Sequence, residues 1–293
     1  MNVQACVEQI YTNFESSDLY YGHGTDNAWD EAVYLVFTVL GLPFGDDGDS
    51  QRMVRQRLLS TDEWRHINAL AHRRSSERVP MAYLVGEAWF AGLPFYVDQR
   101  VLVPRSPIAE LVLQQYQPLL PRPPARVLDL CTGSGCIGIA TALAFPDARV
   151  DLADISEDAL AVAQQNIQRH GLQDRVTTVC SDLFAKVDVD YDLIVCNPPY
   201  VSAQEVAGLP PEYQREPALG LLSDEDGLAI PLQILRQAGA HLSPEGVLVL
   251  ELGYTWPLLD QRYPQFPVTW LEFDSGGEGV LAIRRDALIR AER

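Results

Sequence analysis

Apolar segments that alternate with helical patterns fill the second half of the chain, and they restrict the folds it can adopt. From Arg126 onward, continuous apolar runs such as "RVLDLC" and "YDLIVCN" are separated by segments with helical spacing, such as "DALAVAQQNIQRHG". Strands that are apolar along their whole length are buried on both faces, and strands that alternate with helices pair in parallel. The sequence therefore predicts an α/β domain with a mainly parallel sheet, covered by helices on both faces.

The end of the chain departs from this alternation. The runs "VTWLEF" and "GVLAIRR" are separated only by "DSGGE". A parallel crossover needs a dozen or more residues, so this gap is too short for one. We predict that these two strands form an antiparallel hairpin at the edge of the sheet.

A separate helical unit is predicted before the α/β part. Val3, Val7 and Ile10 recur at helical spacing, Thr25 or Asp26 can cap the next helix, and residues 51–75 again show a helical pattern. The segment "YLVGEAWFAGLPFYVDQRVLVPR" is rich in aromatic and β-branched residues and predicts a β-hairpin. A helix from about Pro107 to Tyr116 follows it.

The proline-rich segment "QPLLPRPPA" is typical of a domain boundary. We therefore expect a helical N-terminal domain over residues 1–80 and a linker of hairpin and helix over 81–120. The α/β domain then extends over residues 121–293.

Composition limits the partners of the chain. The formal net charge is −18, and clustered cations, which phosphate contacts require, are missing from the sequence. The five cysteines have no metal-finger spacing and are typical of reduced intracellular thiols. The N-terminus lacks the pattern of a cleavable signal, and the longest apolar run, residues 32–42, is about half of a membrane span. We expect a soluble, cytoplasmic protein with a basic polypeptide partner rather than a polyanion.

A glycine-rich loop lies at the first strand-to-helix junction of the α/β part. Gly133, Gly135 and Gly138 of "DLCTGSGCIG" form the pattern G-x-G-x-x-G, and Asp154 ends the next strand. The pattern suits a dinucleotide, and a tight turn without a ligand is the simpler alternative. Asp129 precedes the loop, which has no basic neighbour, and this favours a cofactor that carries an ammonium group. Asp129 could instead only hold the amides of the loop.

Two further strand ends carry polar residues. Asp182 follows the third strand, where it could bind the amine of an adenine with Leu183 packed on the ring, and Asn197 ends the fourth. Ligands of open α/β sheets bind at the carboxyl edge of the strands, where all these residues are expected to meet. The motif "NPPY" begins at Asn197, and its two prolines have no backbone N–H. It is a stiff corner that offers hydrogen-bond acceptors and no donors, so it suits a ligand with an NH₂ group.

These motifs resemble the class I S-adenosylmethionine-dependent methyltransferases with Rossmann-like sheets, and "NPPY" narrows the resemblance to enzymes that methylate a planar nitrogen. Across nearly its whole length the chain is similar to the HemK-type protein-glutamine methyltransferases. The segment "PRSPIAEL" and the cysteines at 131 and 136 are similar to the PrmB branch, which modifies a glutamine in the third protein of the large ribosomal subunit.

The resemblance also implies roles for particular residues. The Asn197 side-chain oxygen and the Pro198 carbonyl are expected to hold the two N–H groups of the amide, with the Tyr200 ring beside its plane and Pro199 in the same substrate site. The helical domain is expected to recognise the substrate, and no metal is implied. The cofactor S-adenosylmethionine, which leaves as S-adenosylhomocysteine, is expected to contact Asp129, Cys131, Thr132, Gly133, Ser134, Gly135, Asp154, Asp182, Leu183 and Asn197.

Other substrates and roles stay open at this point. They are a glutamine of a peptide-chain release factor, an exocyclic amine of a nucleic acid, or attachment to ribosomal precursors without catalysis. Six acids follow the NPPY corner against one base, Arg215, and favour a basic protein substrate, although they could form merely a solvated acidic loop. The six are Glu205, Glu212, Glu216, Asp224, Glu225 and Asp226. Arg105 and Glu110 could line the substrate entrance or only pack locally.

Overall fold

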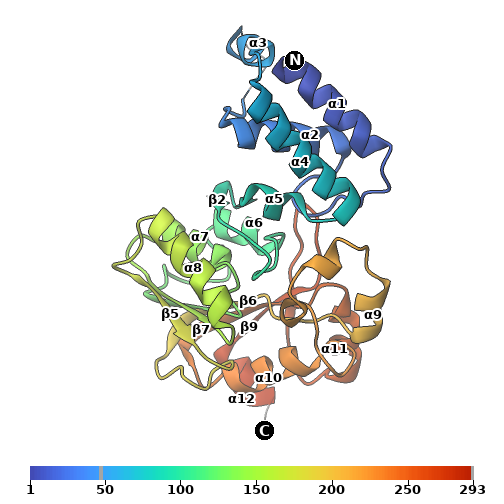
Figure 1. The fold of residues 1–293 in the computed structure, drawn as a ribbon. Coiled ribbons are helices and arrows are strands. Elements are labelled where there is room, and N and C mark those ends of the chain that lie inside the picture. The colour runs from blue at the N-terminus through green and yellow to red at the C-terminus, as the bar shows by residue number, and fades with distance from the viewer. Residues whose placement is uncertain (46–48, 292–293) are drawn as a thin grey trace. The chain divides into compact units, whose positions relative to one another are not determined.

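The computed structural model describes residues 1–45 and 49–291 (Figure 1). The chain divides into two compact units: Met1–Glu87 with Pro210–Arg215, and Ala88–Leu209 with Glu216–Arg293. Residues 81–120, which we expected to link two domains, do not form a unit of their own in this division. The chain therefore leaves the larger unit at residue 209, adds six residues to the helical unit, and returns.

The helices described in the helical unit are α1 (Val3–Glu15), α2 (Ala28–Leu40), α3 (Asp49–Gln56), α4 (Thr61–Glu77) and α5 (Met81–Val85). The helical spacing predicted for the first residues is confirmed, since Val3, Val7 and Ile10 are buried on one face of α1. The predicted cap of α2 is wrong. Asn27 is the N-cap, because its backbone is extended and its side chain accepts a hydrogen bond from Asp30 N at 2.9 Å.

The helical pattern of residues 51–75 belongs to two helices rather than one. Ser60 and Glu63 form a capping box that begins α4, with Glu63 N donating to Ser60 Oγ and Ser60 N donating to Glu63 Oε2. The apolar faces of α1, α2 and α4 bury a core of their own, which includes Phe14, Leu35 and Ile67. The helical unit is thus built as an independent hydrophobic cluster.

The larger unit is organised by a seven-stranded sheet with the order β5-β4-β3-β6-β7-β9-β8. Neighbouring strands from β5 to β7 are parallel, whereas β9 is antiparallel to both β7 and β8. The predicted mixed sheet with an antiparallel terminal pair is confirmed. The strands are β3 (Arg126–Leu130), β4 (Arg149–Asp154), β5 (Val176–Cys180), β6 (Tyr191–Cys196), β7 (Leu242–Glu251), β8 (Thr269–Trp270) and β9 (Val280–Arg284).

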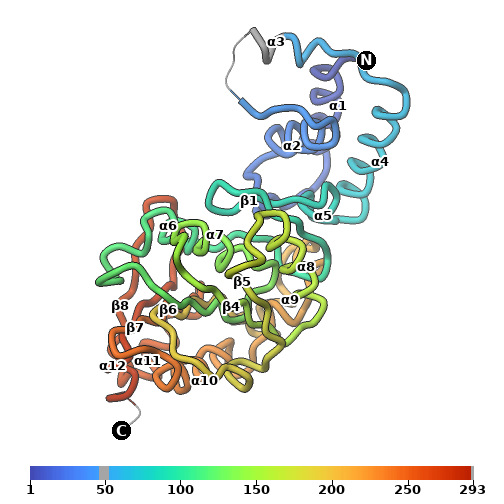
Figure 2. Tube along the Cα trace, turned by 90° about the vertical axis from the view of Figure 1, so that its left-hand side faces the viewer, coloured from blue at the N-terminus to red at the C-terminus, as the bar shows by residue number. Residues whose placement is uncertain are grey.

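Helices cover both faces of this sheet, as Figure 1 and Figure 2 show. Consecutive strand residues point to opposite faces, so Val195 belongs to the cluster packed under α6, α7 and α8, and Ile194 to the cluster packed under α10, α11 and α12. The helices of this unit are α6 (Ile108–Leu113), α7 (Cys136–Ala144), α8 (Glu157–Arg169), α9 (Ala203–Gly208), α10 (Ala229–Ala238), α11 (Trp256–Arg262) and α12 (Arg285–Ala291).

The predicted hairpin before the sheet is confirmed as β1 (Ala88–Phe90) and β2 (Leu93–Phe95), which pair antiparallel around Gly92 at φ +75°. The helix expected from Pro107 to Tyr116 is shorter, since α6 ends at Leu113. Within the described ranges, no helix combines the length and the apolar character needed to cross a membrane.

Candidate active site

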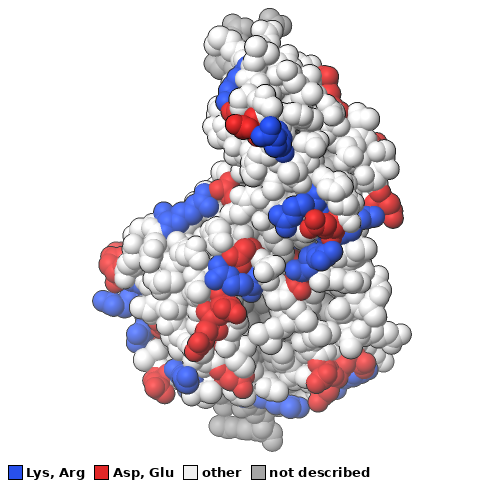
Figure 3. Space-filling model, viewed as in Figure 1, with Lys and Arg blue, Asp and Glu red and all other residues white. Residues whose placement is uncertain are grey.

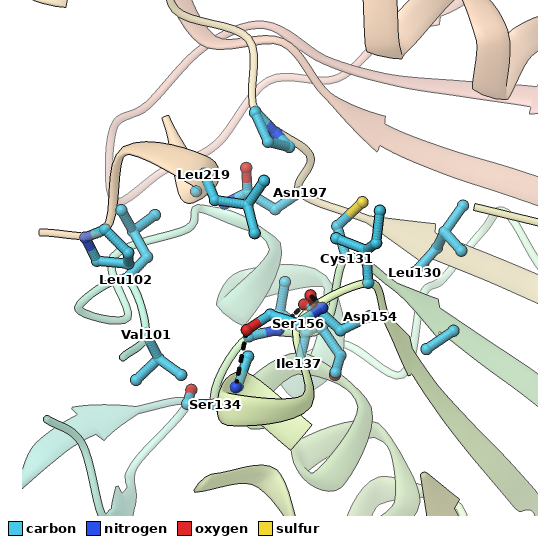
Figure 4. Close-up of a pocket in the computed structure, with 18 of the residues that line it drawn as sticks. Val101, Leu102, Leu130, Cys131, Ser134, Ile137, Asp154, Ser156, Asn197 and Leu219 are labelled. Atoms are coloured by element: carbon cyan, nitrogen blue, oxygen red, sulfur yellow. Dashed lines mark hydrogen bonds between the residues drawn. The ribbon is translucent and has the colours of Figure 1, made fainter. Parts of the chain in front are cut away.

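A cavity of about 360 Å³ lies at the carboxyl edge of the parallel strands (Figure 4). Its walls come from the loops that follow β3, β4, β5 and β6, from residues 100–106, from residues 217–220 and from α10. Of the predicted site residues, those that line it are Cys131, Thr132, Gly133, Ser134, Asp154, Asp182, Leu183, Asn197 and Pro199. Asp129, Gly135, Pro198 and Tyr200 lie behind this lining or beside it.

The glycine loop connects β3 to α7 and forms one wall of the cavity. Gly133 and Gly135 have φ values of +55° and +80°, which L side chains rarely adopt. A Cβ at Gly138 would lie 2.3 Å from Leu152 Cδ2 and 2.8 Å from Asp129 Cβ. The first two glycines therefore shape the loop, while the third lets α7 pack directly on the sheet.

Asp129 lies on β3 underneath the loop and is 1% exposed. Its Oδ2 accepts hydrogen bonds from Thr132 Oγ1 at 2.6 Å and from Gly138 N at 2.8 Å. Its Oδ1 is buried and has no hydrogen-bond partner among residues 1–45 and 49–291. Burial raises the pKa of the carboxyl to about 7, although the two hydrogen bonds oppose this rise. One oxygen thus holds the loop, and the other is a buried acceptor without a partner among the described residues.

Asp154 ends β4 on the other side of the glycine loop. Its Oδ2 accepts from Gly133 N and its Oδ1 from Ser156 N, each at 2.9 Å, so the carboxylate is fixed at the cavity wall (Figure 4). Burial raises its pKa, and the hydrogen bonds from Ser156 and Gly133 oppose the shift. A carboxylate held in this way can still accept hydrogen bonds from ligand hydroxyls, since each oxygen has a further lone pair.

Asp182 and Leu183 form the wall that follows β5. Leu183 has φ +45°, which is rare for a residue other than glycine. The Ser181 hydroxyl supports this turn by donating to Leu183 O at 2.8 Å and accepting from Lys186 N at 3.0 Å. Both Asp182 and Leu183 line the cavity, and Leu183 also packs against the hydrophobic cluster under α10, α11 and α12.

Asn197 follows the last residue of β6, and Figure 4 shows it at the cavity together with Leu219. In the described part of the chain, no group donates a hydrogen bond to the Asn197 side chain or to the Pro198 carbonyl. Pro199 lines the cavity and adds no donor. An acceptor corner is therefore open beside the pocket.

Tyr200 lies next to this corner and is not among the residues that line the cavity. Its Oη donates to Glu251 Oε1 at 3.0 Å, and its carbonyl accepts from Thr255 Oγ1 at 2.9 Å. Glu251 is the last residue of β7 and also accepts a hydrogen bond from Ser106 Oγ. Sequence reasoning did not find Glu251, because nothing in its local sequence distinguishes it from the end of a buried strand.

The acidic segment after the corner is less exposed than its sequence indicates. Glu212 and Glu216 are buried in ion pairs, the first with Arg74 at 2.9 Å and the second with Arg105 at 2.7 Å. The acids that stay exposed are Glu205, Asp224, Glu225 and Asp226. On the face drawn in Figure 3, acidic and basic side chains are interspersed rather than gathered in one patch.

The two residues considered for the substrate entrance have different surroundings. Arg105 lines the cavity and pairs with Glu216 through both terminal nitrogens, each at 2.7 Å. Glu110 accepts hydrogen bonds from Asp274 N at 3.2 Å and Ser275 N at 3.1 Å, so it holds the loop before β9. Sequence reasoning also missed Val101, Leu102 and Leu219, which line the cavity without any chemical motif.

The arrangement of titratable side chains also bears on metal binding. Throughout the described residues, no group of three or more His, Cys, Asp or Glu side chains is arranged to hold a metal ion.

Comparison with known proteins agrees with this geometry. The family described as "Methyltransferase small domain" matches residues 109–209, which include the glycine loop and the NPPY corner. The catalytic domain of hMettl16, solved in complex with MAT2A 3'UTR hairpin 6, shares the fold with a TM-score of 0.53. Its identity is 18% over 77% of this chain and 82% of that chain. The sheet, the glycine loop and the cavity at the carboxyl edge define a class I, Rossmann-like methyltransferase.

Two curated relatives narrow this class. The ribosomal protein uL3 glutamine methyltransferase of Francisella tularensis is 44% identical over 94% of this chain and 87% of its own length. The protein of the same name from Neisseria gonorrhoeae is 44% identical over 96% of this chain and 93% of its own length. The chain belongs to the family of ribosomal protein uL3 glutamine methyltransferases, which confirms the resemblance found in the sequence.

Proposed function

We propose that the chain transfers a methyl group from S-adenosylmethionine to the side-chain amide nitrogen of a glutamine in ribosomal protein uL3. The observation that carries the proposal is the acceptor corner at the cavity wall, where the Asn197 side chain and the Pro198 carbonyl accept no internal hydrogen bond within the described residues. The names of the two relatives, both 44% identical, support the choice of uL3. A ribosomal protein substrate implies action in the cytoplasm.

The cavity residues fit S-adenosylmethionine, which supplies an electrophilic methyl group on a sulfonium sulfur when bound. A volume of about 360 Å³ lies within the usual range of small-molecule sites. The unpartnered Asp129 Oδ1 suits the ammonium group of the cofactor, and the Asp154 carboxylate suits its ribose hydroxyls. Asp182 and Leu183 would bind the adenine, and Cys131, Thr132, Gly133, Ser134 and Gly135 supply the loop around the methionine portion.

The corner would hold the substrate amide by its two N–H groups. Asn197 Oδ1 accepts one and the Pro198 carbonyl accepts the other, with Pro199 and the Tyr200 ring beside the amide plane. Orientation of this kind can supply roughly 7–11 kcal/mol of a reaction barrier. The two acceptors also stabilise the positive charge that develops on the nitrogen until its proton leaves to solvent.

The same corner would select for an NH₂ group. A substrate that presents a hydroxyl or a methyl group would leave at least one buried acceptor unpaired, which costs about 1–3 kcal/mol. The exposed acids Glu205, Asp224 and Glu225 follow the corner and favour the approach of a basic protein.

Recognition of the wider substrate surface is assigned to the helical unit, which we predicted over residues 1–80. The support is the path of the chain, because the segment that follows the NPPY corner contributes Pro210–Arg215 to the helical unit. The corner that would hold the amide is therefore connected to the helical unit through a short stretch of chain that includes α9.

The proposal is tested by incubating the purified chain with isotope-labelled S-adenosylmethionine and three unmodified acceptors. These are uL3, a peptide-chain release factor and ribosomal RNA. Mass spectrometry of the labelled product then locates the methyl group. We expect one glutamine side chain of uL3 to carry it. Label on the release factor alone, on RNA alone, or on a uL3 residue other than glutamine would contradict the proposal.

A further inference from the structure

We infer that Glu251 is a positioning residue for methyl transfer, because its carboxylate fixes the Tyr200 ring in the orientation that flanks the substrate amide. The inference rests on the proposed function, in which Tyr200 lies beside the amide plane. Glu251 itself does not line the cavity. It would act only through Tyr200.

The sheet places Glu251 beside the NPPY corner. Cys196 of β6 pairs with Leu250 of β7 in the parallel ladder, so the next residue of each strand is Asn197 on one side and Glu251 on the other. Glu251 is 5% exposed. A carboxylate so deeply buried needs hydrogen-bond donors, because desolvation without compensation is costly.

Both carboxylate oxygens of Glu251 have such donors. Tyr200 Oη donates to Oε1 at 3.0 Å, and Ser106 Oγ donates to Oε2. Burial raises the pKa of Glu251, while these two hydrogen bonds and the charge of Arg105 oppose the rise. The Tyr200 phenol is thus hydrogen-bonded to a carboxylate that the Ser106 hydroxyl also holds.

The backbone around Tyr200 leaves the ring little freedom. Gly253 has φ +48°, and a Cβ at this position would lie 2.7 Å from Tyr200 Cε2. A Cβ at Gly227 would lie 2.1 Å from the Tyr200 carbonyl oxygen, which also accepts the hydrogen bond from Thr255 Oγ1. The ring therefore packs on the backbone of Gly253. The phenol oxygen and the backbone carbonyl of Tyr200 are each hydrogen-bonded.

A second layer of backbone supports Gly253 from behind. A Cβ at Gly279 would lie 2.0 Å from Gly253 O, and Leu252 N donates to Gly279 O at 2.7 Å. A Cβ at Gly277 would lie 2.8 Å from Pro107 Cβ. Three segments far apart in sequence, residues 104–110, 251–255 and 274–279, thus form one continuous support. This arrangement explains Gly277 and Gly279 of "DSGGEG" physically, since side chains at these two positions would displace the wall behind Tyr200.

The consequence for the reaction is a loss of alignment when the hydrogen bond is removed. A misplacement of about 1 Å in a reacting group can cost on the order of 100-fold in rate. The loops after β3, β4 and β5 would keep their own hydrogen bonds, because Glu251 bonds to Ser106 and Tyr200, and of these two only Ser106 lines the cavity. We therefore expect kcat for uL3 methylation to fall while the Kd for S-adenosylmethionine stays the same.

Three variants of the full chain test this, with uL3 as substrate: Tyr200→Phe, Glu251→Gln and the double variant. We expect each single variant to lower kcat by about 10- to 100-fold, and the double variant to lose no more than the larger single loss. The matched control is Tyr191→Phe. It removes a similar hydrogen bond, from Tyr191 Oη to Asp151 Oδ2 at 2.7 Å. Tyr191 is the first residue of β6, whereas the NPPY corner follows the last, so the control should leave kcat unchanged.

A spectroscopic measurement separates positioning from a general structural role and does not depend on the substrate. In protein with ¹³C-labelled tyrosine rings, the Tyr200 signal is assigned by its absence in Tyr200→Phe. We expect Glu251→Gln to shift this signal and to leave the Tyr191 signal in place. If Glu251→Gln does not fold, Glu251→Asp takes its part, because it keeps the charge but shortens the reach to Tyr200 Oη.

The outcomes distinguish this inference from the proposed function. Methyl transfer by the wild-type chain to an acceptor other than uL3 would contradict the proposed substrate, and the same variants would then be compared on that acceptor. Losses that multiply in the double variant, or a Tyr200 signal and kcat unchanged in Glu251→Gln, would overturn the positioning role of Glu251.

Discussion

Arg74 and Glu212 form a buried ion pair within the helical unit, with Arg74 Nη1 2.9 Å from Glu212 Oε1. Arg74 also donates from Nε to Glu31 Oε2 at 2.9 Å, and both partner carboxylates are buried. Burial tends to raise the pKa of Glu212, but hydrogen bonds from Arg74, Tyr20 N and Arg78 lower it overall. The residues that follow the NPPY corner are thus anchored in the helical unit by a fully desolvated charge pair.

Replacement of Arg74 by methionine should destabilise the helical unit strongly. It would leave the buried Glu31 carboxylate without its arginine and Glu212 with Arg78 alone. The loss of one partner of a buried pair typically costs about 3–5 kcal/mol. The control is Arg73→Met, since Arg73 pairs with Glu77 at 3.4 Å with both side chains 50% exposed. An exposed pair contributes at most about 1 kcal/mol. Chemical denaturation followed by circular dichroism would measure the free energy of unfolding of both variants. Equal losses of stability would contradict a stabilising role for the buried pair.

The pair also predicts loss of stability in acid. The pKa of Glu212 is lowered in the folded state, so its contribution is fully present above the unfolded pKa of roughly 4.3. The contribution is lost as the pH falls through the lower folded value. The free energy of unfolding of the wild-type chain should therefore decrease below about pH 4 more steeply than that of Glu212→Gln. Parallel pH profiles for the two proteins would speak against a charged Glu212 in the folded state.

Cofactor affinity should depend on the ionisation of Asp129. Its pKa of about 7 means that the carboxyl is mostly protonated at pH 5.5 and mostly ionised at pH 7.5. The ammonium group of S-adenosylmethionine needs the ionised form, so affinity should rise by about ten-fold or more over this range. Calorimetry at several pH values measures the trend, with Asp129→Asn as the comparison. A wild-type affinity that is independent of pH would contradict contact between Asp129 and the ammonium group.

A side chain at Gly138 should lower the stability of the fold. In Gly138→Ala the new Cβ would meet Leu152 Cδ2 at 2.3 Å and Asp129 Cβ at 2.8 Å, so α7 must move away from the sheet. Overpacking of this kind typically costs about 1–3 kcal/mol. Gly208→Ala is the control, because a Cβ there would have no neighbour within 4 Å and the backbone needs no positive φ. Gly138→Ala should unfold at a lower temperature than Gly208→Ala. Similar unfolding midpoints would contradict the close packing of α7 on the sheet at Gly138.

The parts of the fold that could be predicted are those encoded by neighbouring residues. Apolar runs identified β3, β4 and β6, and the short gap "DSGGE" identified the antiparallel terminal pair. The glycine loop and NPPY could be placed at one edge of the sheet because parallel strands share the direction of their ends. Local spacing also suggested Thr25 or Asp26 as a cap, and it failed there because Asn27 offers the same chemistry one position later.

The features that sequence reasoning missed depend on contacts between distant residues. Arg74 and Glu212 are 138 positions apart, and Arg105 and Glu216 are 111 apart. Counted in sequence, both glutamates contribute to an acidic loop, whereas in the structure their charges are neutralised internally. The contacts that hold Tyr200 could not be predicted for the same reason. They join the end of β7 and the residues before β9 to the segment before α6.

In the proposed function, Asn197 holds the substrate amide and does not bind the charged groups of the methyl donor. The most direct test of this role is Asn197→Ala, with transfer to uL3 and calorimetric affinity for S-adenosylmethionine measured on the same preparation. We expect transfer to be abolished while affinity stays within a few-fold of wild type, because removal of one acceptor leaves Asp129 and Asp154 in place. Transfer at the wild-type rate, or loss of cofactor affinity together with activity, would contradict it.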